Sequence, residues 1–145
     1  MRKMIFASAI AGALLLSGCS LFGMTKYDSN TDGKTLKAKG YEISNYTAEE
    51  AKAKISGINF EDVNCKGALF AEKGEGDDKD LFIGFYFDSV DEAEKFNAKN
   101  NYENQGLIHD HCERILGKNL KLKVGSHNNV AYGGSETTAN LLYNI

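Results

Sequence analysis

The heptapeptide LFIGFYF, residues 81–87, constrains the fold of this chain more than any other segment. Every residue in it except Gly84 carries a large apolar or aromatic side chain. Side chains of a strand point alternately to its two faces, and here both faces are apolar. We therefore predict a β-strand with one row of side chains on each face: Leu81, Ile83, Phe85 and Phe87 on the first, and Phe82, Gly84 and Tyr86 on the second.

At three other places in the chain, a Ser or Thr followed by acidic residues predicts the start of a helix. Thr47, Ser89 and Ser135 can each accept hydrogen bonds from the first free amides of a helix, and Glu50 completes a capping box with Thr47. Alternating segments predict strands near residues 41–43, 63–71, 120–124 and 130–132. This order of elements predicts the α+β class, as a small antiparallel sheet with helices on one face. The first six elements match the split β-α-β order of ferredoxin-like folds, and a C-terminal β-α unit follows them.

The N-terminus has the pattern of an export signal. Arg2 and Lys3 are positive, and residues 4–16 are apolar or small. This run of about 13 residues fits the hydrophobic region of a signal peptide. It is shorter than the roughly 20 apolar residues that a membrane-spanning helix needs. We therefore expect residues 1–18 to be a signal peptide that is removed on export.

The signal ends in Leu16-Ser17-Gly18-Cys19, which resembles the lipobox of bacterial lipoprotein precursors. The resemblance implies cleavage between Gly18 and Cys19, and acylation of Cys19 as the first residue of the mature chain. Two or three acyl chains, such as palmitate, hold a protein stably on a membrane, whereas one chain does not. The implied location is the cell membrane, outside the cytoplasm. Ser20 favours the periplasmic face of the outer membrane if the cell has two membranes. An ordinary secretory signal with an incidental cysteine is the alternative.

The mature chain is long enough for one domain with a hydrophobic core. Removal of 18 of the 145 residues leaves 127. We expect residues 19–39, which are small, polar and charged, to be the lipidated N-terminus and a flexible tether, and residues 40–145 to form a single α+β domain. Without Arg2 and Lys3, 15 of the 17 basic residues remain against 20 acidic ones, a formal charge of −5. Binding of nucleic acid requires a basic surface, so we expect no nucleic-acid partner.

Two cysteines remain after Cys19 is assigned to lipid. In an exported domain, Cys65 and Cys112 are most simply explained as a disulfide pair. A bridge that closes this loop would stabilise the fold by about 4 kcal/mol in the chain-entropy treatment. The sequence does not establish that the two residues approach each other, so a bridge and two free thiols both remain open.

The segment GLIHDHCERILG, residues 106–117, contains several side chains that can bind a metal ion. At 100° per residue, Ile108, Cys112 and Leu116 fall on one apolar helical face, while His109 and His111 lie about 160° apart around the axis. This separation prevents the two histidines from binding one ion within a helix. We therefore expect a buried Cys112, no metal site and no cofactor. The alternative is a zinc-dependent envelope enzyme that uses His109, His111 and Cys112, and it requires an extended segment.

The best candidate for a binding surface is the second face of strand 81–87. If helices cover only the first face, Phe82 and Tyr86 stand on an open sheet surface, beside Phe70. Such a surface would bind a peptide, a glycan or another envelope protein, unless further chain buries it. No nucleophile motif or phosphate-binding loop is recognisable. We therefore expect a membrane-anchored, non-enzymatic binding or envelope accessory protein, similar to small uncharacterised envelope lipoproteins.

Overall fold

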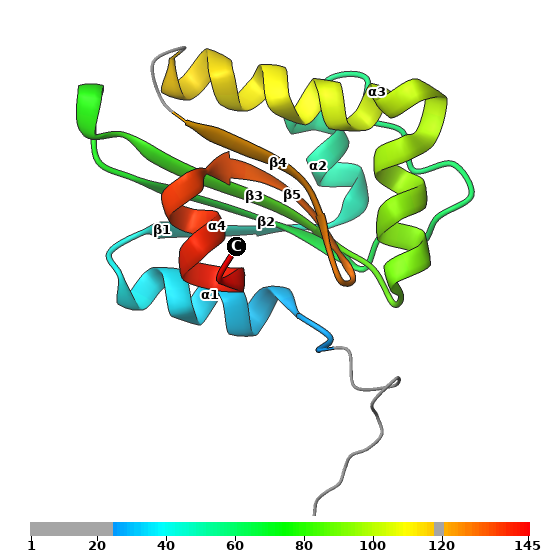
Figure 1. Ribbon diagram of the computed structural model, residues 1–145, viewed down its shortest axis with the longest axis horizontal. Coiled ribbons are helices and arrows are strands. Elements are labelled where there is room, and N and C mark those ends of the chain that lie inside the picture. The colour runs from blue at the N-terminus through cyan, green and yellow to red at the C-terminus, as the bar shows by residue number, and fades with distance from the viewer. Residues whose placement is uncertain (1–24, 118–120) are drawn as a thin grey trace, which may run out of the picture.

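The computed structural model describes residues 25–117 and 121–145, without the side chains of residues 99–102. Within these residues, five strands form one antiparallel sheet in the order β1-β2-β3-β5-β4 (Figure 1). The strands are β1 (Glu42–Tyr46), β2 (Gly67–Lys73), β3 (Asp80–Tyr86), β4 (Leu122–His127) and β5 (Val130–Ser135). The helices are α1 (Ser29–Ala38), α2 (Ala48–Lys54), α3 (Val90–Leu116) and α4 (Glu136–Tyr143), with a short 3₁₀ turn η2 (Gly76–Asp78). The predicted α+β class and antiparallel sheet are confirmed.

The predicted helix caps are present. The hydroxyl of Thr47 accepts a hydrogen bond from the amide of Glu50, whose side chain accepts one from the amide of Thr47, so the capping box starts α2. Ser89 and Ser135 accept bonds from first-turn amides of α3 and α4 in the same way. Each cap satisfies a backbone donor that has no partner inside its helix, and therefore fixes where the helix begins.

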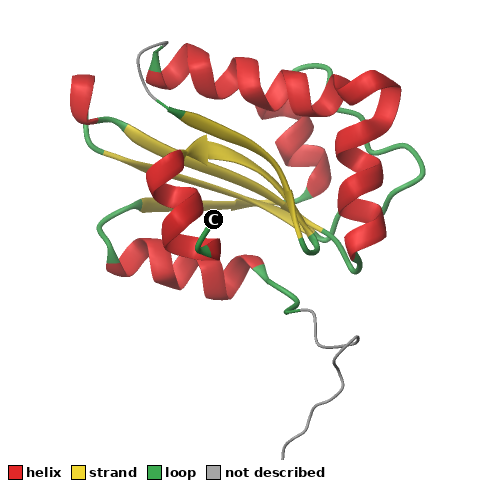
Figure 2. Ribbon diagram, viewed as in Figure 1, coloured by secondary structure: helices red, strands yellow, loops and turns green. Residues whose placement is uncertain are grey.

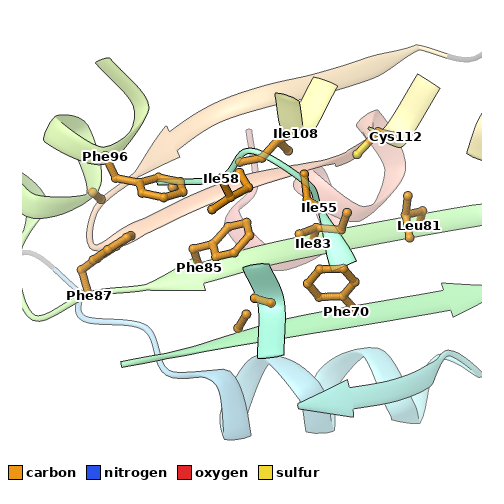
Figure 3. Close-up of a cluster of buried hydrophobic side chains, with 14 of the residues drawn as sticks. Ile55, Ile58, Phe70, Leu81, Ile83, Phe85, Phe87, Phe96, Ile108 and Cys112 are labelled. Carbon is orange, nitrogen blue, oxygen red and sulfur yellow. The ribbon is translucent and has the colours of Figure 1, made fainter. Parts of the chain in front are cut away.

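Helices cover both faces of the sheet, so the prediction of helices on one face is wrong (Figure 2). On the first face, α2 and α3 pack on the row that contains Ile83 and Phe85, and Figure 3 shows this core. On the second face, α1 and α4 pack on Phe82 and Tyr86. The physical reason lies in β3 itself. Both of its rows are large and apolar, and each row gains free energy when it is removed from water.

The ferredoxin-like arrangement of the first six elements is also wrong. The strands that α2 connects, β1 and β2, are antiparallel neighbours and not the parallel pair of a split β-α-β unit. The chain has one such unit further on. Both β3 and β4 run antiparallel to β5, which lies between them, so β3 and β4 are parallel and connected by α3. The order of elements fits both arrangements. Because β3 is apolar from Leu81 to Tyr86, it takes the centre of the sheet, with β2 and β5 beside it.

Residues 29–38, expected to belong to the flexible tether, form helix α1 on the sheet. Asp28 caps this helix through the amide of Thr31, and Asp32, Gly33 and Leu36 are its buried residues. The sequence pattern was too weak to reveal the helix, because Leu36 is the only large apolar residue within it. The folded unit therefore begins before residue 40. Residues 19–24 of the expected tether lie outside the described residues.

Candidate functional site

A hollow of about 320 Å³ opens between β1, β2 and the C-terminal half of α3. The alternation of β1 directs Glu42, Ser44 and Tyr46 to one face, and the register with β2 places Ser44 opposite Phe70 and Glu42 opposite Glu72. The hollow is lined by Glu42, Ser44, Tyr46, Lys54, Phe70, Glu72, His111 and Ile115. Its volume lies at the lower end of the range that is usual for small-molecule sites, about 300–1,000 Å³.

Aromatic rings line one part of the hollow. The rings of Tyr46 and Phe70 meet edge to face with their centroids 5.1 Å apart, and the ring of His111 lies 6.3 Å from that of Phe70. The ammonium of Lys54 lies over the Tyr46 ring at 5.1 Å from its centroid, within the range of a cation–π contact. These contacts pack the rings against one another and place them in a wall of the hollow that polar and charged side chains otherwise line.

The charged groups of the hollow are unequally paired. The carboxylate of Glu72 lies 2.7 Å from the ammonium of Lys79. Glu42 faces Glu72 across the two strands and forms no ion pair with any cation of the described residues. Carboxylates directly opposite each other on a sheet repel, so a cation supplied from outside the chain would be stabilised at Glu42.

His111 contributes a neutral ring to the hollow. Its Nδ1 lies 2.9 Å from Nη2 of Arg114, and since a guanidinium can only donate, Nδ1 is the acceptor. Burial lowers the pKa of His111, and the nearby charge of Arg114 lowers it further against the opposing effect of Glu72. The ring is therefore uncharged at neutral pH and can offer its second nitrogen to a ligand as a donor.

The predicted aromatic binding face does not exist as an open surface. Phe82 is fully buried and Tyr86 is 3 % exposed, because α1 and α4 cover them. Phe70 lies on the opposite face of the sheet, since the register pairs it with Ile83 and pairs Phe82 with Ala71. The prediction that the three residues form one surface is therefore wrong. Of the three, only Phe70 lines the hollow.

Cys65 and Cys112 are free thiols, so the disulfide considered from the sequence is not formed. The Cys65 thiol donates to the carbonyl of Gly67 at 3.3 Å, at the start of β2, whereas Cys112 packs over Gly133 of β5. These anchoring points lie on strands separated by β3. They are also three residues, about 10 Å, apart along it. A disulfide requires Cα atoms within about 7 Å of each other.

The residues considered for a zinc site are on α3 but do not converge. Cys112 is buried in the core, as expected, while His109 is exposed beside Asp110 and His111 lines the hollow. Burial raises the pKa of the Cys112 thiol to about 12, which disfavours the thiolate that zinc requires. Among the described residues, no group of three His, Cys, Asp or Glu side chains is placed to hold a metal ion.

A buried carboxylate is a feature that sequence reasoning missed. Oδ2 of Asp32 accepts hydrogen bonds from the hydroxyls of Tyr86 and Tyr143, each at 2.8 Å. Burial raises the pKa of Asp32, although the two hydroxyls act in the opposite direction. The three residues belong to α1, β3 and α4, so the network fastens both helices of the second face to the sheet. No sequence signal distinguished Asp32 from the polar residues around it.

The N-terminal segment is fastened to the sheet by side chains of the β4–β5 turn. Asn129 accepts from the amide of Tyr27 at 2.7 Å and donates to the carbonyls of Tyr27 and Phe87 at 2.8 and 2.9 Å. Asn128 donates to the carbonyl of Thr25 at 2.8 Å. The first described residues, 25–27, are therefore already hydrogen-bonded to the folded unit. Gly18 and Cys19, the predicted cleavage and lipidation site, lie outside the described residues.

No protein-family model, curated protein or solved structure matches this chain. No helix within the described residues is long and apolar enough to cross a membrane.

Proposed function

We propose that this chain is a lipid-anchored, non-enzymatic binding protein of the bacterial cell envelope. The observation that carries the proposal is the fastening of residues 25–27 to the fold, a few residues after the lipobox cysteine Cys19. These contacts shorten the stretch of chain between Cys19 and the folded unit, and would therefore hold an acylated domain close to the membrane.

The distance from lipid to domain is short. Thr25 is six residues after Cys19, and six extended residues span at most about 20 Å. The end of the sheet that bears Asn128 and Asn129 would therefore face the membrane. In a bacterium with two membranes, Ser20 supports the periplasmic face of the outer membrane as the location.

Binding is supported over catalysis by the use that the fold makes of its reactive side chains. Cys112 is core packing, Asp32 is bonded to two tyrosines, and Nδ1 of His111 is occupied by Arg114. The hollow beside β1 combines packed aromatic rings with the hydrogen-bonding groups of Ser44 and His111. Such a site suits a peptide or glycan that has an apolar face and a hydrogen-bonding edge.

The anchor is tested with the full chain expressed in bacteria and labelled with an alkyne analogue of palmitate. We expect the label on the wild-type protein, which should sediment with membranes, and no label on Cys19→Ser. Cys65→Ser is the matched control and should be labelled as strongly as the wild type. Equal labelling of Cys19→Ser, or release of the wild type into the soluble fraction, would contradict the proposal.

The hollow is tested by titration with a chitooligosaccharide and with a lysine-containing tripeptide, followed by NMR of the histidine side chains. We expect one of the two probes to shift the His111 signals while those of His109, on the exposed side of the same helix, stay unchanged. His111→Ala should weaken binding of that probe, and His109→Ala should not. Equal shifts at both histidines, or none, would exclude the hollow as the binding site.

A further inference from the structure

The first strand of the sheet has an outer edge without a partner. Among the described residues, β1 lies at the end of the sheet and pairs only with β2. Glu42, Ser44 and Asn45 are exposed, and Ile43 and Tyr46 are half-buried. An open edge presents alternate backbone N–H and C=O groups to whatever strand can pair with them.

Opposite charges stand at the two ends of this edge, on one face. Glu42 is at the first position of β1 and faces Glu72, and the ammonium of Lys79, which pairs with Glu72, acts on Glu42 only from a longer distance. Lys54 lies over the ring of Tyr46 at the last position of β1. Lys54 forms no ion pair with a carboxylate of the described residues. Neither Glu42 nor Lys54 therefore has an ion-pair partner within 4 Å among the described residues, and the length of the strand holds the two charges apart.

We infer that β1 is a homodimer interface, in which the edges of two copies pair antiparallel around a two-fold axis at Ser44. This register is the one that pairs all five residues of β1. It places Glu42 of each copy opposite Tyr46 of the other, and therefore beside Lys54 of the other. The two sheets become one continuous sheet. The two-fold axis then gives two equivalent pairs of Glu42 from one copy with Lys54 from the other.

The occupant is a second copy because the complementarity is within β1 itself. A basic peptide of another protein would satisfy Glu42 and leave Lys54 unpaired. The opposite edge of the sheet offers no equivalent arrangement. Strand β4 carries Lys123 and no acidic residue, so antiparallel self-pairing there would bring no opposite charges together. A lysine on an edge strand is also a common means of preventing such pairing.

The pairing is tested by crosslinking of the full chain in intact cells with a short, membrane-permeant bifunctional maleimide. Directly opposed side chains of an antiparallel pair have Cβ atoms about 5 Å apart, so Ser44→Cys should yield a covalent dimer. Ser126→Cys, an exposed serine on the opposite edge strand, is the matched control. We expect at least about tenfold more dimer from Ser44→Cys, which corresponds to about 1.4 kcal/mol of preference. Equal yields, or adducts of Ser44→Cys with other proteins only, would overturn the inference.

Charge exchange distinguishes a second copy from any other partner. In the Ser44→Cys background, Glu42→Lys and Lys54→Glu should each lower the yield of dimer about tenfold or more, because each replaces two attractive contacts by repulsive ones. The double variant restores opposite charges between copies, and its yield should recover. Failure of the double variant to recover, although each single variant loses the dimer, would overturn the inference. The readout does not require acylation of Cys19, so failure of the pairing and failure of the anchor are distinguishable, and binding in the hollow is tested separately at His111.

Discussion

The hydroxyl of Tyr143, on the C-terminal helix, donates a hydrogen bond of 2.8 Å to the carboxylate of Asp32, on the first helix, 111 residues away in the sequence. Tyr86 of the central strand donates to the same oxygen. A carboxylate buried among apolar residues is costly unless it is hydrogen-bonded, and two neutral hydroxyls compensate for only part of that cost. The three residues therefore hold α1 and α4 on the sheet and introduce a dependence of stability on pH.

We predict that replacement of this carboxylate by an amide changes how stability varies with pH. Burial raises the pKa of Asp32 in the folded state above its ordinary value of 3.8. Between those two values the unfolded chain binds fewer protons than the folded chain, so the free energy of unfolding falls as pH rises through this window. Asp32→Asn does not titrate but keeps an oxygen that can accept from both tyrosines.

The measurement is urea unfolding of wild type and Asp32→Asn from about pH 3 to pH 7. The stability of the variant relative to wild type should rise with pH through the window and then stay constant. All other titrating groups are common to both proteins and cancel in the difference. A difference that does not change with pH would mean that the carboxyl of Asp32 has the same pKa in both states.

A second prediction concerns the approach of α3 to the sheet. A methyl group at Gly133 of β5 would overlap Cγ2 of Ile108 and lie 3.2 Å from Sγ of Cys112. Gly133→Ala should therefore reduce the free energy of unfolding by about 1–3 kcal/mol through overpacking. Gly125→Ala, on the neighbouring strand with nothing within 4 Å, is the control and should change it by less than about 1 kcal/mol.

The same clash can be relieved by a second change. Ile108→Ala removes the methyl group that Gly133→Ala would meet, so the double variant should be more stable than the sum of the two single effects predicts. Urea unfolding of the four proteins measures this coupling. Strictly additive effects would show that the helix moves away from β5 and that the side chains do not collide.

Local features of this fold could be predicted from the sequence, but which faces are covered could not. The strand at residues 81–87, the helix caps and the buried position of Cys112 each depend on side chains that are close in sequence. Helix α1 was missed because its burial depends on Asp32, which becomes satisfied only through Tyr86 and Tyr143, far along the chain. The prediction of an open aromatic face was wrong for the same reason, because α1 and α4 cover that face.

The hollow beside β1 was beyond sequence reasoning as well. It needs the register that sets Ser44 opposite Phe70, together with the position of α3 that brings His111 near them. Register depends on which strands are neighbours, and the β1–β2 pairing was not the one that the order of elements suggested. The sequence could predict that Glu42, Ser44 and Tyr46 share one face of a strand. It could not predict that Phe70 and His111 lie beside them.

A third prediction follows from the state of the two cysteines. Burial raises the pKa of Cys65 to about 11 and that of Cys112 to about 12. At pH 8 about one thousandth or less of each thiol is therefore ionised, and only the thiolate reacts readily. Iodoacetamide should label both residues slowly in the native chain and rapidly in guanidinium chloride, as followed by mass spectrometry of the two peptides. Recovery of a peptide pair linked through Cys65 and Cys112 would contradict the structure.

The last prediction concerns the fastening of the N-terminal segment by Asn129. In Asn129→Asp, an oxygen replaces the nitrogen that donates to the carbonyls of Tyr27 and Phe87, so three acceptors meet without a donor. The free energy of unfolding should fall by about 2–4 kcal/mol, since buried polar groups lose their partners. Trypsin should also cleave after Lys26 faster than in the wild type, because the segment opens without unfolding of the sheet.

Asn140→Asp, an exposed position on α4, makes the same chemical change without these contacts and should leave both readouts unchanged. If Asn129→Asp lowers stability but does not accelerate cleavage after Lys26, then the residue supports the β4–β5 turn alone. Faster cleavage would show that Asn129 sets the length of chain between Cys19 and the domain. Release of that segment would add residues 25–28 to the tether, about 13 Å of extended chain, and would let the domain lie further from the membrane.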